Sequence, residues 1–594
     1  MIETLRSAFK LLQLSWRQNR FKTIASLVLV MGNALAAPLM ALALKWMTNA
    51  AVGGDGRTAA IAGFAVAVAV IGTLTLGHFA HIAYFELSEI NQLTMEERLI
   101  ALANGSAGIE HHERAEYADR LTVLQQELRQ MQDGFYAVLA LLSLAVAIAL
   151  TGVLLAFLNP VLLLLPLVAF PPLYTGRRAQ SIMDGAREET ARDTRLAMHL
   201  FRLATTAGPA KELRVFRLQS EIKRRHLELW ERTTRRLWRA EIQAMLWRAA
   251  GQLVFAAGYV AGVLIVVNDA ISGHRSVGDV VLAITLAAQV NQQVSAAVSL
   301  LHNLQRITNA FKRFEWLERY VAEREPKAAD LPVPAKLSQG IRLENVGFAY
   351  PGTDRAVLSG VNLDLPAGST VAIVGENGAG KSTLVKLLCR FYEPTKGSIL
   401  IDGQDLRRIP LAEWRARITS GFQDFARFEF VARRTVGVGD LPALDKQVAV
   451  EAALERAHAS DIVGRLSDGL STQLGKSYTD GTELSGGQWQ KLALGRAMMR
   501  EMPLLLVLDE PTSALDAEAE HALFERYAEG ARRVGEATGG VTVLVSHRFS
   551  TVRMADLILV VADGRIVEAG PHATLMRNRG LYAELYELQA SAYE

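Results

Sequence analysis

The sequence predicts a membrane protein in two parts, an all-α domain of six transmembrane helices followed by an α/β domain with a phosphate-binding loop. Three features of the 594-residue chain indicate this fold class. Long uncharged apolar stretches are confined to the first half, a proline-rich charged segment follows them, and a glycine-rich loop that leads into Lys381 lies beyond that segment. The chain is also too long for a single domain.

The transmembrane helices are predicted from stretches that contain no Asp, Glu, Lys or Arg. These stretches are 23–44, 59–85, 135–176, 249–267 and 280–301. A hydrocarbon core of about 30 Å needs about 20 apolar residues of helix. The third stretch is long enough for two spans, and Asn159-Pro160 offers a break between them, so we expect six spans. A large buried helical core is the alternative, but such cores rarely continue this far without a charge.

The charges of the loops predict the orientation of these spans. Residues 1–22 carry five Lys and Arg and residues 177–248 carry 17, whereas 45–58 and 268–279 carry two and one. The positive-inside rule therefore places the N-terminus and the long loops in the cytoplasm. We expect a multi-pass protein of the cell membrane whose C-terminal domain is also cytoplasmic. The basic, apolar N-terminal segment does not resemble a cleaved signal peptide, because complete spans follow it.

Composition divides the chain into a transmembrane domain (1–322, with long cytoplasmic extensions of the helices), a linker (323–340) and a nucleotide-binding domain (341–594). The linker is rich in proline and charge and has no apolar period. The net charge of +3 gives no indication of a nucleic-acid partner. Cys389 is the only cysteine, which excludes a disulfide within the chain and a Cys-rich metal site.

A phosphate-binding loop opens the chemistry of the C-terminal domain. The β-branched run 370–374 leads into Gly375-x4-Gly380-Lys381-Ser382, and an apolar helical pattern follows. In this context of strand, loop and helix, backbone N–H groups cradle phosphates, Lys381 reaches the β- and γ-phosphate oxygens, and the Ser382 hydroxyl binds Mg2+. Other candidate nucleotide-binding residues in the same stretch are Asn377, Gly378 and Thr383.

A second element, LLLVLDEPTSALD (504–516), reads as a buried strand that ends in Asp509. Asp509 is placed to hold the Mg2+ shell, and the carboxylate of Glu510 is placed to polarise an attacking water. Two acidic residues after an apolar run are common at strand ends. Their position downstream of a phosphate-binding loop is what favours a catalytic function.

A third element, LSGGQ (484–488), precedes a helical pattern. Paired glycines at a helix start let an anion approach unpaired N–H groups. A phosphate-binding loop, LSGGQ and an acid-terminated strand in this order resemble the ATP-binding-cassette (ABC) ATPases, and six spans fused to one such domain resemble a type I ABC exporter half-transporter. The resemblance covers essentially the whole chain.

The resemblance implies further site residues. Tyr350 matches the aromatic residue that stacks on adenine, and Gln423 matches the glutamine that senses Mg2+ and faces the membrane domain. Asp516 matches an acidic residue of the loop between the two ATPase domains, and His547 matches the histidine that contacts the γ-phosphate. Glu510, His547 and Gln423 are thus the expected catalytic residues, with Ser382, Gln423 and (through water) Asp509 at Mg2+.

The family pattern also implies ATP and Mg2+ as ligands and a dimer as the functional unit. In the family, LSGGQ binds the γ-phosphate of the ATP held by the other ATPase domain, so we expect Ser485, Gly486, Gly487 and Gln488 to complete a site on a second half-transporter. The second half is either an identical chain or a different one. No degenerate site motif distinguishes the two, although Trp489 and the aromatic stretch DFARFEF (424–430) depart from the common family pattern.

The expected function is ATP-driven export of a peptide or an amphiphilic small molecule by alternating access in a lipid membrane. An importer with the exporter fold, a lipid flippase and a regulatory ABC protein that does not transport remain alternatives. Polar residues recur on one face of the last span, among them Gln289, Gln292 and Gln293. Polar groups exposed to lipid would be unsatisfied, so these line either a substrate pathway or a contact between helices.

Overall fold

The computed structural model describes residues 2–129, 131–168, 170–324, 329–510, 529–546 and 552–591. The chain forms two compact units. Unit 1 comprises Met1–Asn104 and Asp119–Arg319, and unit 2 comprises Gly105–Ala118 and Tyr320–Glu594. The short segment Gly105–Ala118 therefore belongs with the C-terminal domain although it lies between two helices of the N-terminal half.

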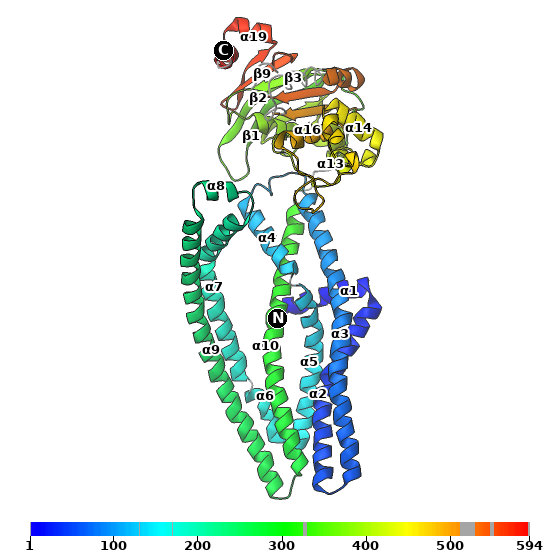
Figure 1. Ribbon diagram of the computed structural model, residues 1–594, viewed down its shortest axis with the longest axis vertical. Coiled ribbons are helices and arrows are strands. Elements are labelled where there is room, and N and C mark those ends of the chain that lie inside the picture. Colours follow the sequence, from blue (N-terminus) through cyan, green and yellow to red (C-terminus); the bar gives the residue numbers. More distant parts are fainter. Residues whose placement is uncertain are drawn as a thin grey trace. The chain divides into compact units, whose positions relative to one another are not determined.

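Unit 1 is helical, as the sequence predicts (Figure 1). Its helices, together with their ends beyond the unit, are α1 (Ile2–Gln18), α2 (Arg20–Val52), α3 (Gly56–Gly105), α4 (Ala115–Arg129), α5 (Met131–Leu158), η1 (Pro160–Leu164), α6 (Leu165–Val168), α7 (Phe170–Thr205), α8 (Ala210–Val215), α9 (Gln219–Ile271) and α10 (Val277–Ala322). The 50 residues of α3 extend over about 75 Å, well beyond a hydrocarbon core of about 30 Å.

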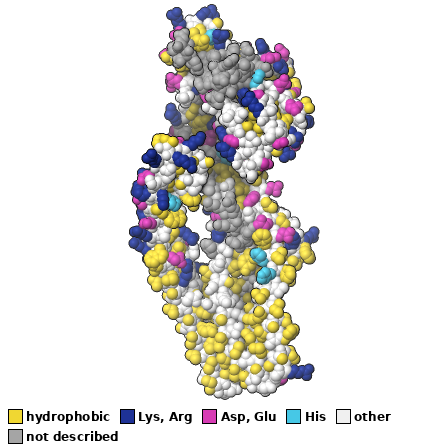
Figure 2. All heavy atoms as spheres, viewed as in Figure 1, with side chains coloured by type: hydrophobic (Ala, Val, Ile, Leu, Met, Phe, Trp, Pro, Cys, Tyr) yellow, Lys and Arg dark blue, Asp and Glu magenta, His cyan; other side chains and the backbone are white. Residues whose placement is uncertain are grey.

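Five helices of the described residues are long and apolar enough to cross a membrane, and they contain five of the predicted spans. They are α2, α3, α5, α9 and α10. Their outer surface is apolar: Phe157 is 76% exposed and Leu253 is 71% exposed. Figure 2 shows hydrophobic side chains covering the lower part of unit 1, with few charged side chains among them. This surface suits a lipid environment.

The remaining predicted span, after Asn159-Pro160, begins with the short 3-10 helix η1. The Asn159 side chain caps η1 by accepting a hydrogen bond from Val161 N, which confirms the break after α5. The apolar segment that follows continues from η1 into α6, which is described to Val168, and α7 is described from Phe170 onward. Proline removes a backbone donor, and Pro160 at the start of η1 accounts for the break after α5.

Unit 2 contains an α/β domain with two sheets. One sheet has the strand order β2-β1-β4-β5 and the other β10-β9-β3-β8-β7-β6. The strands are β1 (Gly340–Ala349), β2 (Ala356–Pro366), β3 (Thr370–Val374), β4 (Lys396–Ile401), β5 (Gln404–Asp405), β6 (Ile418–Gly421), β7 (Leu505–Asp509), β8 (Val541–Val545), β9 (Leu557–Ala562) and β10 (Arg565–Gly570). The larger sheet is parallel from β9 through β3, β8 and β7 to β6. Its remaining strand, β10, is antiparallel to β9.

The strands β3, β7 and β8 lie at the centre of the larger sheet and are fully buried. Their continuous apolar runs are typical of parallel strands covered on both faces. The helices of this domain that have both ends among the described residues are α11 (Lys381–Leu388), η2 (Leu406–Arg408), α12 (Leu411–Ala416), α13 (Ala432–Gly437), η3 (Leu441–Ala443), α14 (Gln447–Arg456), α15 (Ser460–Gly464), η4 (Gly469–Ser471), α16 (Gly486–Ala497), α19 (His572–Asn578) and α20 (Leu581–Ser591). A separate apolar core joins α13, α14 and α16 around Trp489.

Candidate functional site

The candidate site lies at one edge of the larger sheet. Because β3, β6, β7 and β8 run parallel, the loops that leave their carboxyl ends meet at the same edge. These loops carry the phosphate-binding loop after β3, Gln423 after β6 and Glu510 after β7. Ser546 follows β8 there, and the predicted residue His547 lies just outside the described residues, as does Asp516. The topology therefore explains why motifs far apart in the chain come together.

Two glycines of the phosphate-binding loop are required by its backbone. Gly375 has φ +146°, and a Cβ there would overlap the carbonyl oxygen of Val561. Gly380 has φ +110°, and a Cβ there would lie 2.8 Å from a methyl group of Leu358. Between them Asn377 and Gly378 are exposed. The loop is thus tightly packed at its two ends, Gly375 and Gly380, and exposed in its middle, which suits close approach of a phosphate to backbone N–H groups.

Lys381 begins helix α11 and is held inside the loop. Its side chain is 8% exposed, and Nζ donates to the carbonyl oxygens of Gly375 at 2.8 Å and Glu376 at 2.9 Å. Burial lowers the pKa of Lys381, although the charges of Glu510 and Asp509 act in the opposite direction. A cation enclosed by carbonyl oxygens at the loop centre is positioned to meet phosphate oxygens. Ser382, the next residue, is exposed.

The acidic residues occupy the end of β7. Asp509 is 9% exposed, and burial raises its pKa to about 6, with the charges of Glu510 and Asp424 acting in the same direction. Glu510 adopts φ +46°, and its N–H donates to the carbonyl oxygen of Val545 on β8 at 2.9 Å. This bond ties the strained residue to the central strand. Accumulated negative charge in a partly buried site favours a cation there.

Gln423 reaches across the site to Glu510. Its Nε2 donates to Oε2 of Glu510 at 2.7 Å, so the structure brings these two predicted residues together. Gln490, which lies outside the predicted motifs, donates through Nε2 to the carbonyl oxygen of Glu510 at 3.3 Å. The sequence analysis did not predict Gln490 and Asp424 as site residues. Gln490 lies just after LSGGQ and Asp424 directly after Gln423, and this proximity is the signal by which the sequence could have indicated them.

Tyr350 lies next to the phosphate-binding loop. Its hydroxyl forms a hydrogen bond of 3.0 Å with Oγ1 of Thr383, which is a buried residue of α11. The ring of Tyr350 packs edge-on against Tyr392 with centroids 5.3 Å apart. Contacts with Thr383 and Tyr392 therefore hold the ring of Tyr350 close to the phosphate-binding loop. One nucleotide can then bind with its base at the ring and its phosphates at the loop.

The LSGGQ segment forms the capped start of α16. The Ser485 hydroxyl accepts from Gln488 N at 3.3 Å, and Gln488 Oε1 accepts from Ser485 N at 2.8 Å. This capping box fixes the first turn. A Cβ added to Gly486 would meet nothing within 4 Å, and Gly487 is half-buried. The start of the helix is thus ordered by its own side chains and presents an open surface.

The three glutamines predicted on one face of the last span have different surroundings in unit 1. Gln289 is buried, and its Nε2 donates to the carbonyl oxygen of Ala37 on α2 at 2.8 Å. Gln293 donates to Oγ1 of Thr151 on α5 at 3.0 Å. Gln292 is exposed. Two of the three therefore make the helix–helix contacts that the sequence left as an alternative, and Gln292 is the one open to the surroundings.

The chemistry of the site fits a magnesium nucleotide. Carboxylate, hydroxyl and amide oxygens bind Mg2+ either directly or through a water molecule. Asp509, Ser382 and Gln423 supply these groups at the sheet edge, beside the lysine and backbone N–H groups that suit phosphates. No group of three or more His, Cys, Asp or Glu residues is arranged as a metal site within the described part of the chain.

Comparison with known proteins identifies the class of domain to which this part of the chain is similar. A family model described as ABC transporter matches residues 358–513. The ATP-dependent lipid A-core flippase of Chromohalobacter salexigens is 36% identical over 339 residues, which cover 57% of this chain and 56% of the relative. The corresponding protein of Escherichia coli (strain K12) is 34% identical over 310 residues, 51% of each chain. The chain spans about half the length of the curated relatives it matches.

A solved structure extends the similarity to both units. The structure described as a bacterial Atm1-family ABC exporter with ATP bound matches with a TM-score of 0.79 and 25% identity. The match covers 96% of this chain and 98% of the other. An ABC ATPase domain binds ATP, which identifies the nucleotide that suits the site. Residues 358–513 therefore form an ATPase domain of the ABC transporter family, and the whole chain is similar to an ABC exporter half-transporter, in which a multi-pass helical membrane domain precedes one such domain.

Proposed function

We propose that this chain is one half of an ATP-driven transporter that exports an amphiphilic molecule across the cell membrane. The observation that carries the proposal is the convergence of the phosphate-binding loop, Asp509 and the Gln423–Glu510 pair at one sheet edge. They occur in a chain with five apolar helices of membrane-spanning length among its described residues. An ATPase site with such helices is the composition of a membrane pump.

The ATPase site is proposed to work as follows. The N–H groups of the loop from Gly375 to Gly380 bind phosphate oxygens, and Lys381 exchanges its carbonyl partners for the β- and γ-phosphates. Tyr350 stacks on adenine. Mg2+, when bound near Ser382, Asp509 and Gln423, neutralises charge on the phosphates.

The attacking water is proposed to be oriented by Glu510. Its carboxylate accepts the water proton as a general base, and Gln423 holds that carboxylate in place through the bond to Oε2. His547, which lies outside the described residues, is proposed to contact the γ-phosphate. Hydrolysis removes the contacts that the γ-phosphate makes, and the conformational equilibrium shifts because the two states bind it with different affinity.

The functional unit is proposed to be a dimer with a second half-transporter. The open surface of Ser485, Gly486 and Gly487 at the start of α16 suits a phosphate of ATP held by the partner. Closure of the two ATPase domains over two nucleotides then drives the membrane domains between inward- and outward-facing states. Whether the partner is an identical chain follows from co-purification of two differently tagged copies.

The transported molecule is proposed to pass along the exposed polar face marked by Gln292. A lipid flippase is the second candidate function, because the relatives that match this chain are named as lipid A-core flippases. A flippase moves an amphiphile between leaflets. The exporter and the flippase therefore both need a polar path for the head of the transported molecule beside an apolar path for its tail.

Reconstitution tests the proposal. We expect the full chain in liposomes to hydrolyse MgATP. In vesicles whose ATPase domains face outward, ATP should lower the fraction of a fluorescent lipid that external dithionite quenches, or should load a labelled peptide into the lumen. The Glu510→Gln variant is the control for both. Absence of ATP hydrolysis would overturn the ATPase proposal, and hydrolysis without movement of any amphiphile in the panel would favour a regulatory protein.

A further inference from the structure

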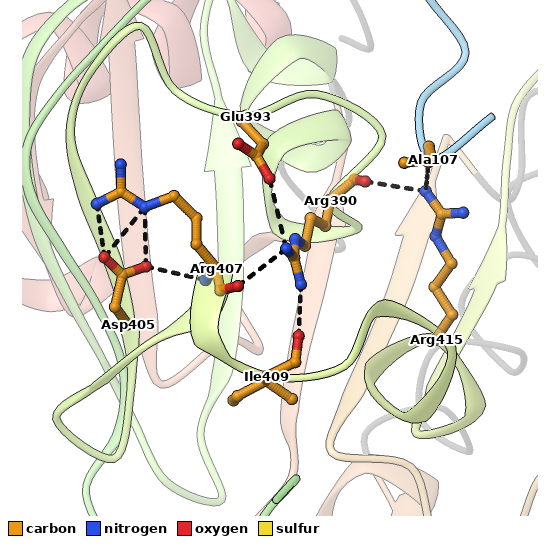
Figure 3. Close-up of polar contacts among 7 residues, drawn as sticks. All are labelled: Ala107, Arg390, Glu393, Asp405, Arg407, Ile409 and Arg415. Carbon is orange, nitrogen blue, oxygen red and sulfur yellow. Dashed lines mark hydrogen bonds and ion pairs between the residues drawn. The ribbon is translucent and has the colours of Figure 1, made fainter. Parts of the chain in front are cut away.

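Within unit 2, side chains attach the segment Gly105–Ala118 at three points, two on the ATPase domain and one at the C-terminal end of α10, and Ile109 N also donates to the carbonyl oxygen of Phe391 at 3.4 Å. The first is a backbone contact: Arg415 donates to the carbonyl oxygen of Ala107 at 2.5 Å and to that of Arg390 at 2.9 Å (Figure 3). Arg390 is itself buried and donates to the carbonyl oxygen of Ile409 at 2.6 Å. This point fixes the position of the segment.

The second and third points are two carboxylates of the same segment. Glu110 accepts from Arg324 at 2.5 Å and from the hydroxyl of Tyr320 at 3.2 Å. Glu113 instead reaches the nucleotide-binding part of the domain, where Oε1 accepts from Lys386 Nζ at 2.7 Å and Oε2 accepts from the hydroxyl of Tyr392. The two carboxylates are thus chemically alike and contact different parts of unit 2.

Both partners of Glu113 surround the ring of Tyr350. Lys386 Nζ lies 5.4 Å from the centroid of that ring and 5.9 Å from the centroid of Tyr392. Tyr392 packs edge-on against Tyr350 with an interplanar angle of 87°. A cation within about 6 Å of an aromatic face is attracted to it. Glu113 therefore binds both the cation and the aromatic ring that lie beside Tyr350.

Glu113 carries its charge at neutral pH. Burial by itself raises the pKa of its carboxyl, but the hydrogen bonds from Lys386 and Tyr392 outweigh that effect and leave the pKa below its ordinary value. The hydrogen bond to Glu113 likewise raises the pKa of Lys386 against the effect of burial. The pair is therefore an ion pair, and the neutral amide of glutamine in place of Glu113 changes its electrostatics without changing its shape.

We infer that Glu113 is a positioning residue for adenine binding, acting through Lys386 and Tyr392 on the ring of Tyr350. The inference rests on the proposed function, in which Tyr350 stacks on adenine. Tyr350 is also tied by its hydroxyl to Thr383 at the phosphate-binding loop. A ring whose hydroxyl is bonded to Thr383 and which is contacted by Lys386 and Tyr392 is preorganised for the base. The affinity for ATP then depends on the contact of Glu113 with Lys386 and Tyr392.

The test is a steady-state ATPase measurement on the full chain in nanodiscs. We expect Glu113→Gln to raise KM for ATP about 3- to 10-fold, the scale of one cation–π contact and one charge-assisted hydrogen bond, while kcat changes less than about 2-fold. Tyr392→Phe, which removes only a hydroxyl, should raise KM in the same direction. Glu113→Asp, which keeps the charge, should recover part of the loss.

Glu110→Gln is the matched control, because it neutralises a carboxylate of the same segment that does not contact Lys386 or Tyr392. We expect its KM to remain within about 2-fold of the wild-type value. Tripolyphosphate, which has no base to stack, should inhibit the wild type and Glu113→Gln with the same inhibition constant.

Three results would overturn the inference. The first is a KM for ATP that is unchanged in both Glu113→Gln and Tyr392→Phe. The second is a rise in KM in Glu110→Gln as large as that in Glu113→Gln. The third is a loss of affinity for tripolyphosphate in Glu113→Gln as large as its loss of affinity for ATP. A wild-type chain that does not hydrolyse ATP would instead overturn the proposed function, so the two failures are distinguishable.

Discussion

Replacing Glu510 by glutamine should separate ATP binding from ATP hydrolysis. The carboxylate Oε2 accepts a hydrogen bond of 2.7 Å from Gln423, and the amide oxygen of glutamine can accept the same bond. The N–H of residue 510 donates to Val545 on β8 regardless of the side chain. The shape of the site should therefore persist, and only the negative charge and the basic oxygen are lost.

The magnitude follows from the role of that oxygen. Loss of a general base typically costs 10²- to 10⁴-fold in rate, so we expect kcat to fall at least about 100-fold, equivalent to about 2.7 kcal/mol of barrier. Binding should not weaken. The charge of Glu510 lies beside Asp509 and Lys381, and its removal reduces the negative charge that incoming phosphates must approach.

The assay is phosphate release by the full chain in nanodiscs, paired with a titration of MgATP binding. Glu501→Gln is a matched control, because Glu501 lies in the same domain, has a side chain that is 70% exposed and pairs with Arg456 rather than with the site. Phosphate release by Glu510→Gln within about 10-fold of the wild-type rate would refute the proposed role. So would a loss of ATP binding equal to the loss of turnover.

Three further predictions concern packing and reactivity. Trp489→Ala should lower the thermal unfolding midpoint strongly, because a side chain only 1% exposed is worth about 3–5 kcal/mol, whereas Trp238→Ala, at a site 65% exposed, should change it little. Burial raises the pKa of the Cys389 thiol to about 12, so maleimide at pH 8 should label the chain only after denaturation with SDS. Asp279→Asn should lower the thermal unfolding midpoint, because it breaks the 2.6 Å ion pair with Lys45. The reversed pair Lys45→Asp/Asp279→Lys should recover part of the loss, and equal midpoints in the single and double variants would contradict this.

Local patterns were enough to predict much of the backbone structure around the candidate site. The buried strands β3 and β7 are continuous apolar runs, and the positive φ values of Gly375 and Gly380 explain why the loop between β3 and α11 needs glycine. The start of α16 was predicted from paired glycines, and its capping box uses Ser485 and Gln488, three residues apart. Each of these features depends on neighbours within a few residues, which a sequence displays directly.

Contacts between distant residues were not predictable in the same way. Glu113 and Lys386 are separated by 273 positions, and no local pattern pairs a charged turn with one lysine of a helix. The spacing of Gln289 and Gln293 placed both on one helical face but could not identify their partners, which are Ala37 and Thr151 on other helices. Side-chain partners across a fold depend on the packing of whole elements, and that information is spread over the chain.

The most direct test of the account is whether one ATP site is built from two chains. Lys381→Ala disables the phosphate-binding loop, and Gly486→Asp places a carboxylate on the open start of α16, where a Cβ meets nothing within 4 Å and the domain can fold around it. A purified heterodimer of these variants, with a different tag on each chain, has both defects in one shared site and none in the other. We predict that vanadate traps one nucleotide per heterodimer and none in either parent homodimer. If the heterodimer also traps none, the site is complete within a single chain and the proposed two-chain sandwich is contradicted.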